Sequence, residues 1–188
     1  MTGQGKNGID FELAKSLKIL AEKYPIEKIT IKQITDQAGV IRPTFYNHFQ
    51  DKYELLEWII RTEILEPLHP LISNGMIEPA MVLLFTNLEK DKKFYTKLVK
   101  MEGPVLFSDI ATKCVKETLL EAILTLAEGK TPKYEWLTPN IIAGYYAQSM
   151  CFACINWIEH DMAIPPEQMA EAYQYIITRS MDDVIREM

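Results

Sequence analysis

Apolar residues spaced three and four positions apart are the feature that most constrains the fold of this chain. Near the start they recur from position 13 to position 24, which is the buried stripe of an amphipathic helix. The same spacing returns in segment after segment, and no stretch alternates cleanly in the two-residue period of a strand. Prolines such as Pro25, Pro67 and Pro70 separate the segments. The pattern therefore predicts an all-α protein.

The breaks between segments and the capping residues set the expected elements. Residues 1–8 contain three glycines and predict a frayed arm. Asp51 is a good N-cap for a helix, with Glu54 as its capping-box partner. Helices are expected over residues 13–24, 30–38, 42–48, 51–66, 76–88, 92–101, from beyond Pro104 to Gly129, over 139–162, and from 166 to about 184.

Residues 30–49 have the features of two short helices joined by a tight turn. Thr30 and Gln33 form a capping box, in which each side chain can bond to the other residue's backbone amide. Gly39 allows the left-handed conformation that ends the first helix. Pro43 lies in the first turn of the second helix, where a proline is tolerated. The spacing predicts a helix-turn-helix.

The second of these helices is unusually polar for its length. Between positions 42 and 48 it carries Arg, Thr, Tyr, Asn and His, whose side chains can bond to phosphate oxygens or to base edges. Phe45 and Phe49 are expected to face inward and to anchor it. The segment is therefore a candidate for entering a groove of DNA.

The whole stretch resembles a known family. The pattern T-x3-I-x3-A-G-V-x3-T-F-Y-x2-F-x2-K-x2-L, from Thr30 to Leu55, is similar to the DNA-binding domain of the TetR family of bacterial transcription regulators. The similarity covers roughly residues 9–66, and the remainder resembles the family only in its helical layout. The resemblance implies an N-terminal three-helix helix-turn-helix DNA-binding domain over residues 1–50. A connecting helix over 51–66 then opens a helical effector-binding and dimerisation domain over 51–188.

The resemblance also implies a role for individual side chains. Family members place the helix at 42–48 in the major groove. Phosphate contacts are implied for Thr30, Tyr46, His48 and Lys52, and base contacts for Arg42, Pro43, Thr44 and Asn47. The chain departs from the family at Ile41, where a Ser or Thr hydroxyl commonly caps the helix or meets a phosphate. Ile41 can do neither, although it can touch a thymine methyl group. Thr35 stands where the family often has Ala, a milder change.

Each of these side chains also has a purely structural interpretation. Tyr46 could be a half-buried core aromatic, and His48 could be a packing residue. Lys52 could be a solvated surface charge. Arg42 and Asn47 could be exposed without any base as partner.

The helix expected over 139–162 is apolar nearly all round, which predicts burial on several sides. One recognition helix reads only a few base pairs, so useful specificity needs two copies about 34–36 Å apart. A homodimer through the last two helices, paired as a four-helix bundle, would meet both requirements. The alternative is that this helix is simply the central core helix of a monomer.

An effector site in the C-terminal domain is also implied by the family. The candidate lining residues are Phe94, Tyr95, Met101, Phe107, Tyr145 and Met150, although such residues are more often core. The segments Trp157–Met162 and Pro166–Met169 are similar to a TetR subgroup that includes activators of dihydroxyacetone-kinase operons. In that subgroup regulation can run through a partner protein. The effector is therefore expected to be a small molecule or a protein.

Other chemistries have less support in the sequence. The pair Cys151 and Cys154 lies mid-helix among apolar residues, whereas redox pairs usually lie at an exposed helix start, so packing is expected. Cys114 has no sequence partner, and His69 and His160 lack metal-ligand spacing. No metal, cofactor or enzymatic activity is predicted, because phosphate-loop and hydrolase motifs are absent. A helical interaction protein without DNA binding is a further alternative.

Composition and charge are compatible with this interpretation. The chain has 188 residues, of which 48% are hydrophobic and 24% charged, as in an ordinary globular protein. The formal net charge is −6, and all of the excess negative charge lies in residues 61–188. The most apolar run, 141–155, is shorter than the ~18 residues of a membrane span. With no signal-peptide core and only three cysteines, a soluble cytoplasmic protein is expected.

Together these observations predict a homodimeric, sequence-specific, DNA-binding transcription regulator. Its expected mode is repression that ends when an effector binds the C-terminal domain. The alternative mode is activation under the control of a partner protein.

Overall fold

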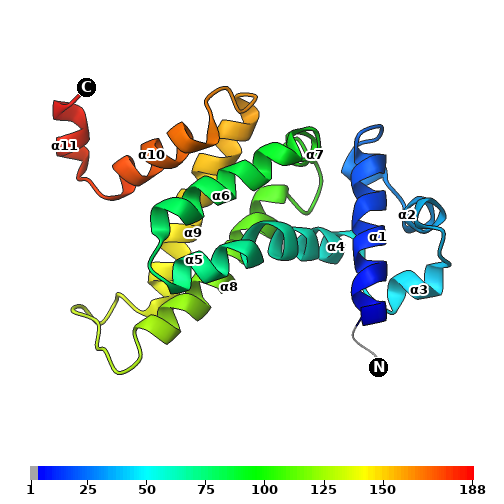
Figure 1. The fold of residues 1–188 in the computed structure, drawn as a ribbon, viewed down its shortest axis with the longest axis horizontal. Coiled ribbons are helices and arrows are strands. Elements are labelled where there is room, and N and C mark those ends of the chain that lie inside the picture. Colours follow the sequence, from blue (N-terminus) through cyan, green and yellow to red (C-terminus); the bar gives the residue numbers. More distant parts are fainter. Residues whose placement is uncertain (1–3) are drawn as a thin grey trace.

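The computed structural model describes residues 4–188, with side chains from Gly8 onward, and this range contains helices and no strand. A small head lies at one end of the molecule and a larger helical body at the other (Figure 1). Of the arm expected over residues 1–8, residues 1–3 lie outside the described range. Residues 4–8 belong instead to the first helix, α1 (Gln4–Ala21). The all-α prediction is confirmed.

The head is built from three helices around a small apolar core. Helix α1 is followed by a 3₁₀ turn, η1 (Ile26–Lys28), then by α2 (Ile31–Ala38) and α3 (Arg42–Tyr46). Its core side chains, which are at most 1% exposed, come from all of these elements and from the next helix: Leu13, Leu17, Ile26, Ile34, Phe45 and Leu55. This burial stabilises the head around α3, whose five residues could not form a stable helix alone.

A continuous helical stretch connects the head to the body. Helix α4 (Lys52–Ile59) passes into a π-helical segment (Ile60–Leu65), in which the amide of Glu66 donates to the carbonyl of Arg61, five residues earlier. A 3₁₀ turn (Glu66–Leu68) and α5 (His69–Ser73) follow. The helix expected over 51–66 therefore ends within one residue of its predicted end, but its second half is π-helical, which was not predicted. Each proline lies in the first turn of a new short helix, where its missing amide costs nothing.

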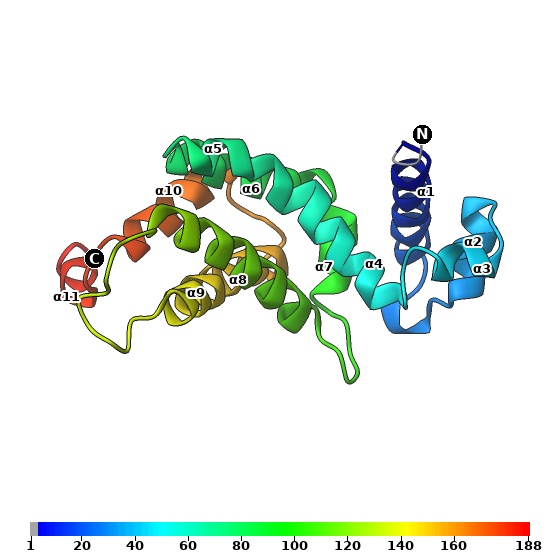
Figure 2. The same ribbon diagram turned by 90° about the horizontal axis from the view of Figure 1, so that it is seen from below.

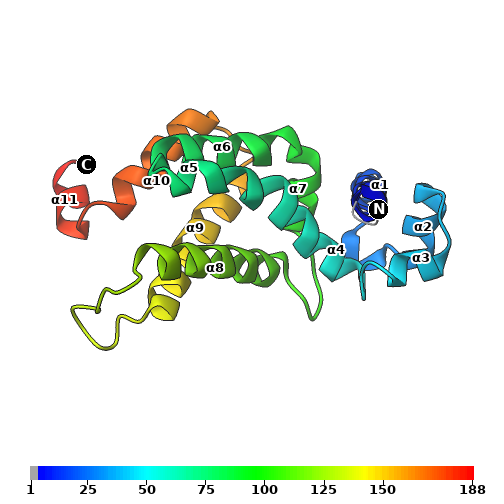
Figure 3. The same ribbon diagram turned by 60° about the horizontal axis from the view of Figure 1, so that its bottom comes forward.

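The body consists of α5 and six further helices. These are α6 (Ile77–Lys90), α7 (Lys92–Leu98), α8 (Phe107–Leu126), α9 (Pro139–Glu159), α10 (Pro166–Ile177) and α11 (Met181–Arg186). Helix α8 packs along α9, and α6 packs along α10 (Figure 3). The C-terminus lies at the end of the body farthest from the head (Figure 1).

The last expected helix, from 166 to about 184, is in fact two helices. Helix α10 ends at Ile177, and α11 begins after Ser180, whose side chain accepts a bond from the amide of Asp183. A serine cap of this kind competes with continuation of the preceding helix. Within residues 4–188, no helix is long and apolar enough to cross a membrane.

Candidate DNA interface

The turn between α2 and α3 has the conformation that its residues predict. The amide of Gln33 donates to Thr30 Oγ1 over 3.2 Å, and the amide of Thr30 donates to Gln33 Oε1 over 2.9 Å, which completes the capping box. Gly39 ends α2 in the left-handed region, with φ +70°. The turn therefore redirects the chain into α3 at a fixed angle.

Helix α3 presents polar side chains on its outer side and buries Phe45 on its inner side. Arg42, Pro43 and Asn47 are exposed, and Thr44 is half-buried. Tyr46 is 50% exposed, and its hydroxyl accepts a 3.2 Å hydrogen bond from Arg42 Nη2. The side chains at the two ends of the helix thus share one surface.

This surface faces away from the rest of the chain. Helices α2 and α3 lie on the far side of α1 from the body (Figures 1 and 2). No element of the described chain covers them there, so a duplex could approach α3 directly. Ile41, which precedes α3, is 68% exposed and makes no side-chain capping bond. It lies on this accessible side as an apolar residue.

His48 and Lys52 lie on the inner side of this region, unlike Arg42 and Tyr46. His48 Nδ1 is 2.6 Å from Asp10 Oδ1, and the two side chains are only 8% and 15% exposed. Lys52 Nζ donates to the backbone carbonyls of Ile26, Glu27 and Ile29. Contacts of these two side chains with phosphate stay a prediction of the sequence analysis, and Nδ1 of His48 is already engaged by Asp10.

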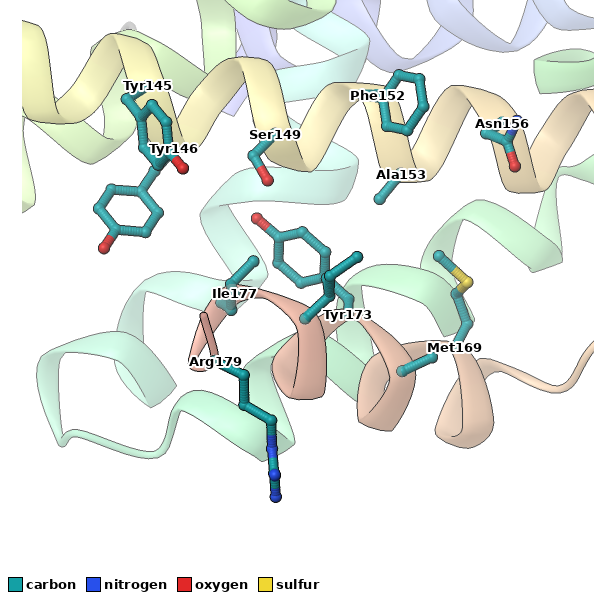
Figure 4. A pocket seen from close by; sticks show the side chains of 12 residues that line it. Tyr145, Tyr146, Ser149, Phe152, Ala153, Asn156, Met169, Tyr173, Ile177 and Arg179 are labelled. Carbon is teal, nitrogen blue, oxygen red and sulfur yellow. The ribbon is translucent and has the colours of Figure 1, made fainter. Parts of the chain in front are cut away.

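A second exposed feature lies on the body, between α9 and α10. A groove of about 420 Å³ separates the two helices, and Figure 4 shows its lining side chains. Tyr145 and Phe152 on α9 are 71% and 73% exposed. The hydroxyl of Tyr173 on α10 points toward Ser149 on α9 (Figure 4). The helix that the sequence predicts to be buried on several sides therefore leaves one apolar side open in a single chain.

Comparison with known families explains the combination of this head and body. The family described as "Bacterial regulatory proteins, tetR family" matches residues 15–59, and the family described as "Transcriptional regulator C-terminal region" matches residues 76–179. The chain belongs to the TetR family. It is a transcriptional regulator with an N-terminal DNA-binding helix-turn-helix.

Individual TetR-family relatives are more distant. The activator DhaS of the dhaKLM operon of Lactococcus lactis subsp. lactis is 27% identical over 141 residues, 74% of this chain and 73% of that protein. A solved structure described as the dihydroxyacetone kinase operon activator DhaS superposes with a TM-score of 0.62 at 21% identity, over 90% of this chain and 94% of that one. A second solved structure is that of NalD, the secondary repressor of the MexAB-OprM multidrug efflux pump in Pseudomonas aeruginosa. It superposes with a TM-score of 0.62 at 18% identity, over 94% of this chain and 96% of that one. At these identities the structural matches show the fold alone.

The six candidate effector residues of this TetR-family regulator do not form one site. An apolar cavity of about 40 Å³ is enclosed by the π-helical segment together with α6, α7, α8 and α9. Tyr95, Phe107 and Met150 line it, whereas Phe94 and Met101 are buried elsewhere in the core. Tyr145, on the open side of α9, lines the groove instead. The open apolar side of α9 was not predicted, so the sequence could not show that Tyr145 lies apart from the cavity residues.

Tyr95 also has an unusual hydroxyl. The side chain is fully buried, and Tyr95 Oη has no hydrogen-bond partner among the described residues. Burial raises the pKa of this phenol well above its usual value, and the nearby carboxylates of Glu63 and Asp91 raise it further. Leaving a buried hydroxyl unpaired costs roughly 1–3 kcal/mol.

Ion pairs between the head and the body were missed by the sequence analysis. Lys18 on α1 pairs with Glu63 of the π-helical segment and, over 2.6 Å, with Asp91 at the start of α7. Arg61 of the same segment pairs with Glu117 on α8. Lys18 and Glu63 are 45 residues apart, and no local pattern marks such a pair. The π-helical segment is therefore bonded to both the head and the body.

Proposed function

We propose that this regulator binds DNA as a homodimer, recognises a specific operator, and acts as a repressor that an effector releases. The observation that carries the proposal is the exposed polar surface of α3 at the free end of the molecule. The division into a DNA-binding region, 1–50, and an effector and dimerisation region, 51–188, is part of it. We place the protein in the cytoplasm, where it would meet its operator.

The individual DNA contacts follow from exposure. Arg42, Pro43, Thr44 and Asn47 are proposed to read base edges in the major groove. Thr30 and Tyr46, which are exposed, are proposed to hold phosphates on either side. A phosphate contact of His48 is proposed from the family resemblance and not from exposure, because its side chain is only 8% exposed. Thr30 is exposed at the N-terminus of α2, and its own amide and hydroxyl both donate to Gln33 Oε1. The amide groups that follow it and the helix dipole would therefore favour the anion there.

Dimerisation is proposed through α9 and α10. The open groove carries aromatic side chains that a monomer leaves in water, and a large exposed apolar patch is typical of an interaction site. A second copy related by a two-fold axis would present the same surface and bury it. The two recognition helices could then meet successive major grooves about 34–36 Å apart.

The effector is proposed to act through the cavity beside Tyr95. No charged residue lines the cavity and its walls present only apolar atoms, so a small apolar molecule suits it. Such a ligand must widen a space of about 40 Å³. Ile60, Ile64 and Leu65 of the π-helical segment form part of the wall, so widening would move the helix that carries the head.

The energetic requirement for this regulation is modest. Coupling of ~1–3 kcal/mol between the effector site and the DNA site changes operator affinity roughly 5–150-fold. Two orientations of the head would differ in the ion pairs of the π-helical segment, Arg61 with Glu117 and Glu63 with Lys18. These contacts could therefore favour one orientation over the other. Repositioning the head by this route would change the separation of the two α3 helices.

A second mode deserves testing because one relative is described as an operon activator. In that mode a partner protein, rather than a small molecule, would act on the body, and DNA binding would raise transcription. Both modes share the same DNA-binding head. The sign of regulation is read from transcription of a template carrying the selected duplex, with and without the protein.

The primary experiment is selection from random duplexes by the purified protein, followed by mobility shift on the enriched sequence. We expect a palindromic consensus with half-sites about one helical turn apart and two protein chains per duplex. Operator recognition would be contradicted if no sequence is enriched and the affinity depends on the salt concentration but not on the duplex sequence. Binding of one chain per duplex would contradict the dimer.

A further inference from the structure

Lys52, the first residue of α4, donates hydrogen bonds from its ammonium group to backbone atoms of the same chain. Lys52 Nζ donates to the carbonyl oxygens of Ile26 and Glu27 over 2.8 Å each, and to that of Ile29 over 2.9 Å. An ammonium group has three N–H donors and no acceptor. All three donors therefore have partners, and none is left for a phosphate oxygen.

The three carbonyls belong to the segment that sets the start of α2. They lie in and just after the 3₁₀ turn η1, and Ile29 directly precedes Thr30, the N-cap of α2. Lys52 therefore ties the entry into α2 to the N-terminus of α4. Burial lowers the pKa of Lys52, which the carboxylates of Glu27 and Asp51 oppose. The ammonium group is partly buried where it makes these bonds.

We propose that Lys52 is a positioning residue for DNA binding, which fixes the turn at residues 26–29 and thereby places Thr30 against the duplex, without touching phosphate itself. To reach a phosphate, Lys52 would have to give up three short hydrogen bonds to gain one contact. The inference rests on the proposed function for its DNA consequence. The structural tie can be tested without DNA.

The first test is amide hydrogen exchange in the free protein. In the turn, the amide of Lys28 donates to Pro25 over 3.0 Å, and that of Ile29 to Ile26 over 3.1 Å. We expect Lys52→Met and Lys52→Arg to speed exchange at both amides. The donors of a guanidinium lie in one plane and point apart, so an arginine would not reproduce three bonds from a single nitrogen. Lys23→Met, in the exposed turn after α1, is the control and should leave both rates unchanged. Unchanged exchange in both Lys52 variants would overturn the proposal.

The second test is the salt dependence of binding to the duplex that the wild-type protein selects. Lys52→Met and Lys52→Arg should both weaken binding, by roughly tenfold, with the slope of log affinity against log salt unchanged. A phosphate contact predicts otherwise, because its loss in Lys52→Met lowers the slope by about 0.9. An arginine would also keep such a contact. A flattened slope in Lys52→Met, or wild-type affinity in Lys52→Arg, contradicts the positioning role.

The third test separates positioning of Thr30 from general loss of structure. Affinities are measured at a temperature where circular dichroism shows each variant folded. Thr30→Ala should weaken binding in the wild type but change it less than twofold in Lys52→Met, whereas Tyr46→Phe should keep its full effect in both backgrounds. Independent effects of Thr30→Ala and Lys52→Met would overturn the inference. If the wild type selects no duplex, the proposed function fails, and the exchange rates still decide the role of Lys52.

Discussion

Arg42 and Asn47 are the exposed side chains at the two ends of α3 that we expect to read base pairs. Replacing either with Ala should relax the sequence preference at one position of each half-site and cost ~1–3 kcal/mol of binding free energy. Selection from random duplexes by each variant measures this directly. Lys15→Ala, on the exposed side of α1, is the control. The same consensus from wild type and variants would remove both residues from base reading.

Tyr46 should behave differently, because its hydroxyl is proposed to meet a phosphate. We expect Tyr46→Phe to weaken binding to all duplexes alike, by roughly tenfold, since a hydrogen bond to a charged group contributes about 1.5–3 kcal/mol. The salt slope should change little because the hydroxyl is neutral. Titrations of specific and scrambled duplexes test this. A loss confined to the specific duplex would assign Tyr46 to base reading instead.

The three thiols should be unreactive in the folded protein. Burial raises the pKa of Cys114 to about 11, and it also raises the pKa values of Cys151 and Cys154, so little thiolate forms at neutral pH. We expect slow alkylation by iodoacetamide at pH 8 and fast alkylation after denaturation. Rapid modification of the native protein, or a disulfide between Cys151 and Cys154 under mild oxidant, would instead support a redox role.

At the scale of the elements, the turn between α2 and α3 depends on Gly39. An added Cβ would meet nothing within 4 Å, so the cost of Gly39→Ala comes only from its φ of +70°. We expect about 1 kcal/mol of destabilisation, or roughly 2–4 °C in thermal unfolding. Gly144→Ala in α9 is the matched control. Its nearest contact is 3.8 Å away, and it should stabilise by up to about 1 kcal/mol. Equal shifts would contradict this reasoning.

The elements that could be predicted are those marked by local chemistry. Thr30 and Asp51 start α2 and α4 as expected, because an N-cap side chain bonds to amides two or three residues away. The π-helical segment could not be predicted, since its register depends on packing against α6 and α8. The division into α10 and α11 was overlooked because the apolar spacing continues across Ser180.

The same distinction applies to the candidate site. The exposed side of α3 could be predicted, since Phe45 and the flanking turn fix which side is buried. The bonds of Lys52 could not, because its partners are backbone carbonyls 23 to 26 residues earlier in the chain. Backbone atoms carry no residue-type signal. His48, two residues beyond α3, and Asp10 on α1 are 38 residues apart and meet only in the folded head.

At the scale of the whole molecule, the open side of α9 is expected to hold two copies together. Phe152→Glu should produce a monomer, because burying an unpaired carboxylate in an apolar interface costs several kcal/mol. Sedimentation velocity measures the state, and operator affinity should fall at least a hundredfold. Trp136→Glu is the control, as an aromatic residue 72% exposed outside the groove. A Phe152→Glu protein that stays dimeric would move the interface elsewhere.

The π-helical segment also affects how this chain tolerates changes in length. A turn closed five residues back holds one more residue than an α-helical turn, so residues 60–65 contain a spare position. Deleting one residue there can restore ordinary helical register and leave both ends aligned. The same deletion within Lys52–Ile59 would rotate the head by about 100° about the helix axis and shift it by about 1.5 Å. A one-residue deletion within residues 60–65 should therefore preserve DNA binding, whereas the same deletion within Lys52–Ile59 should abolish it.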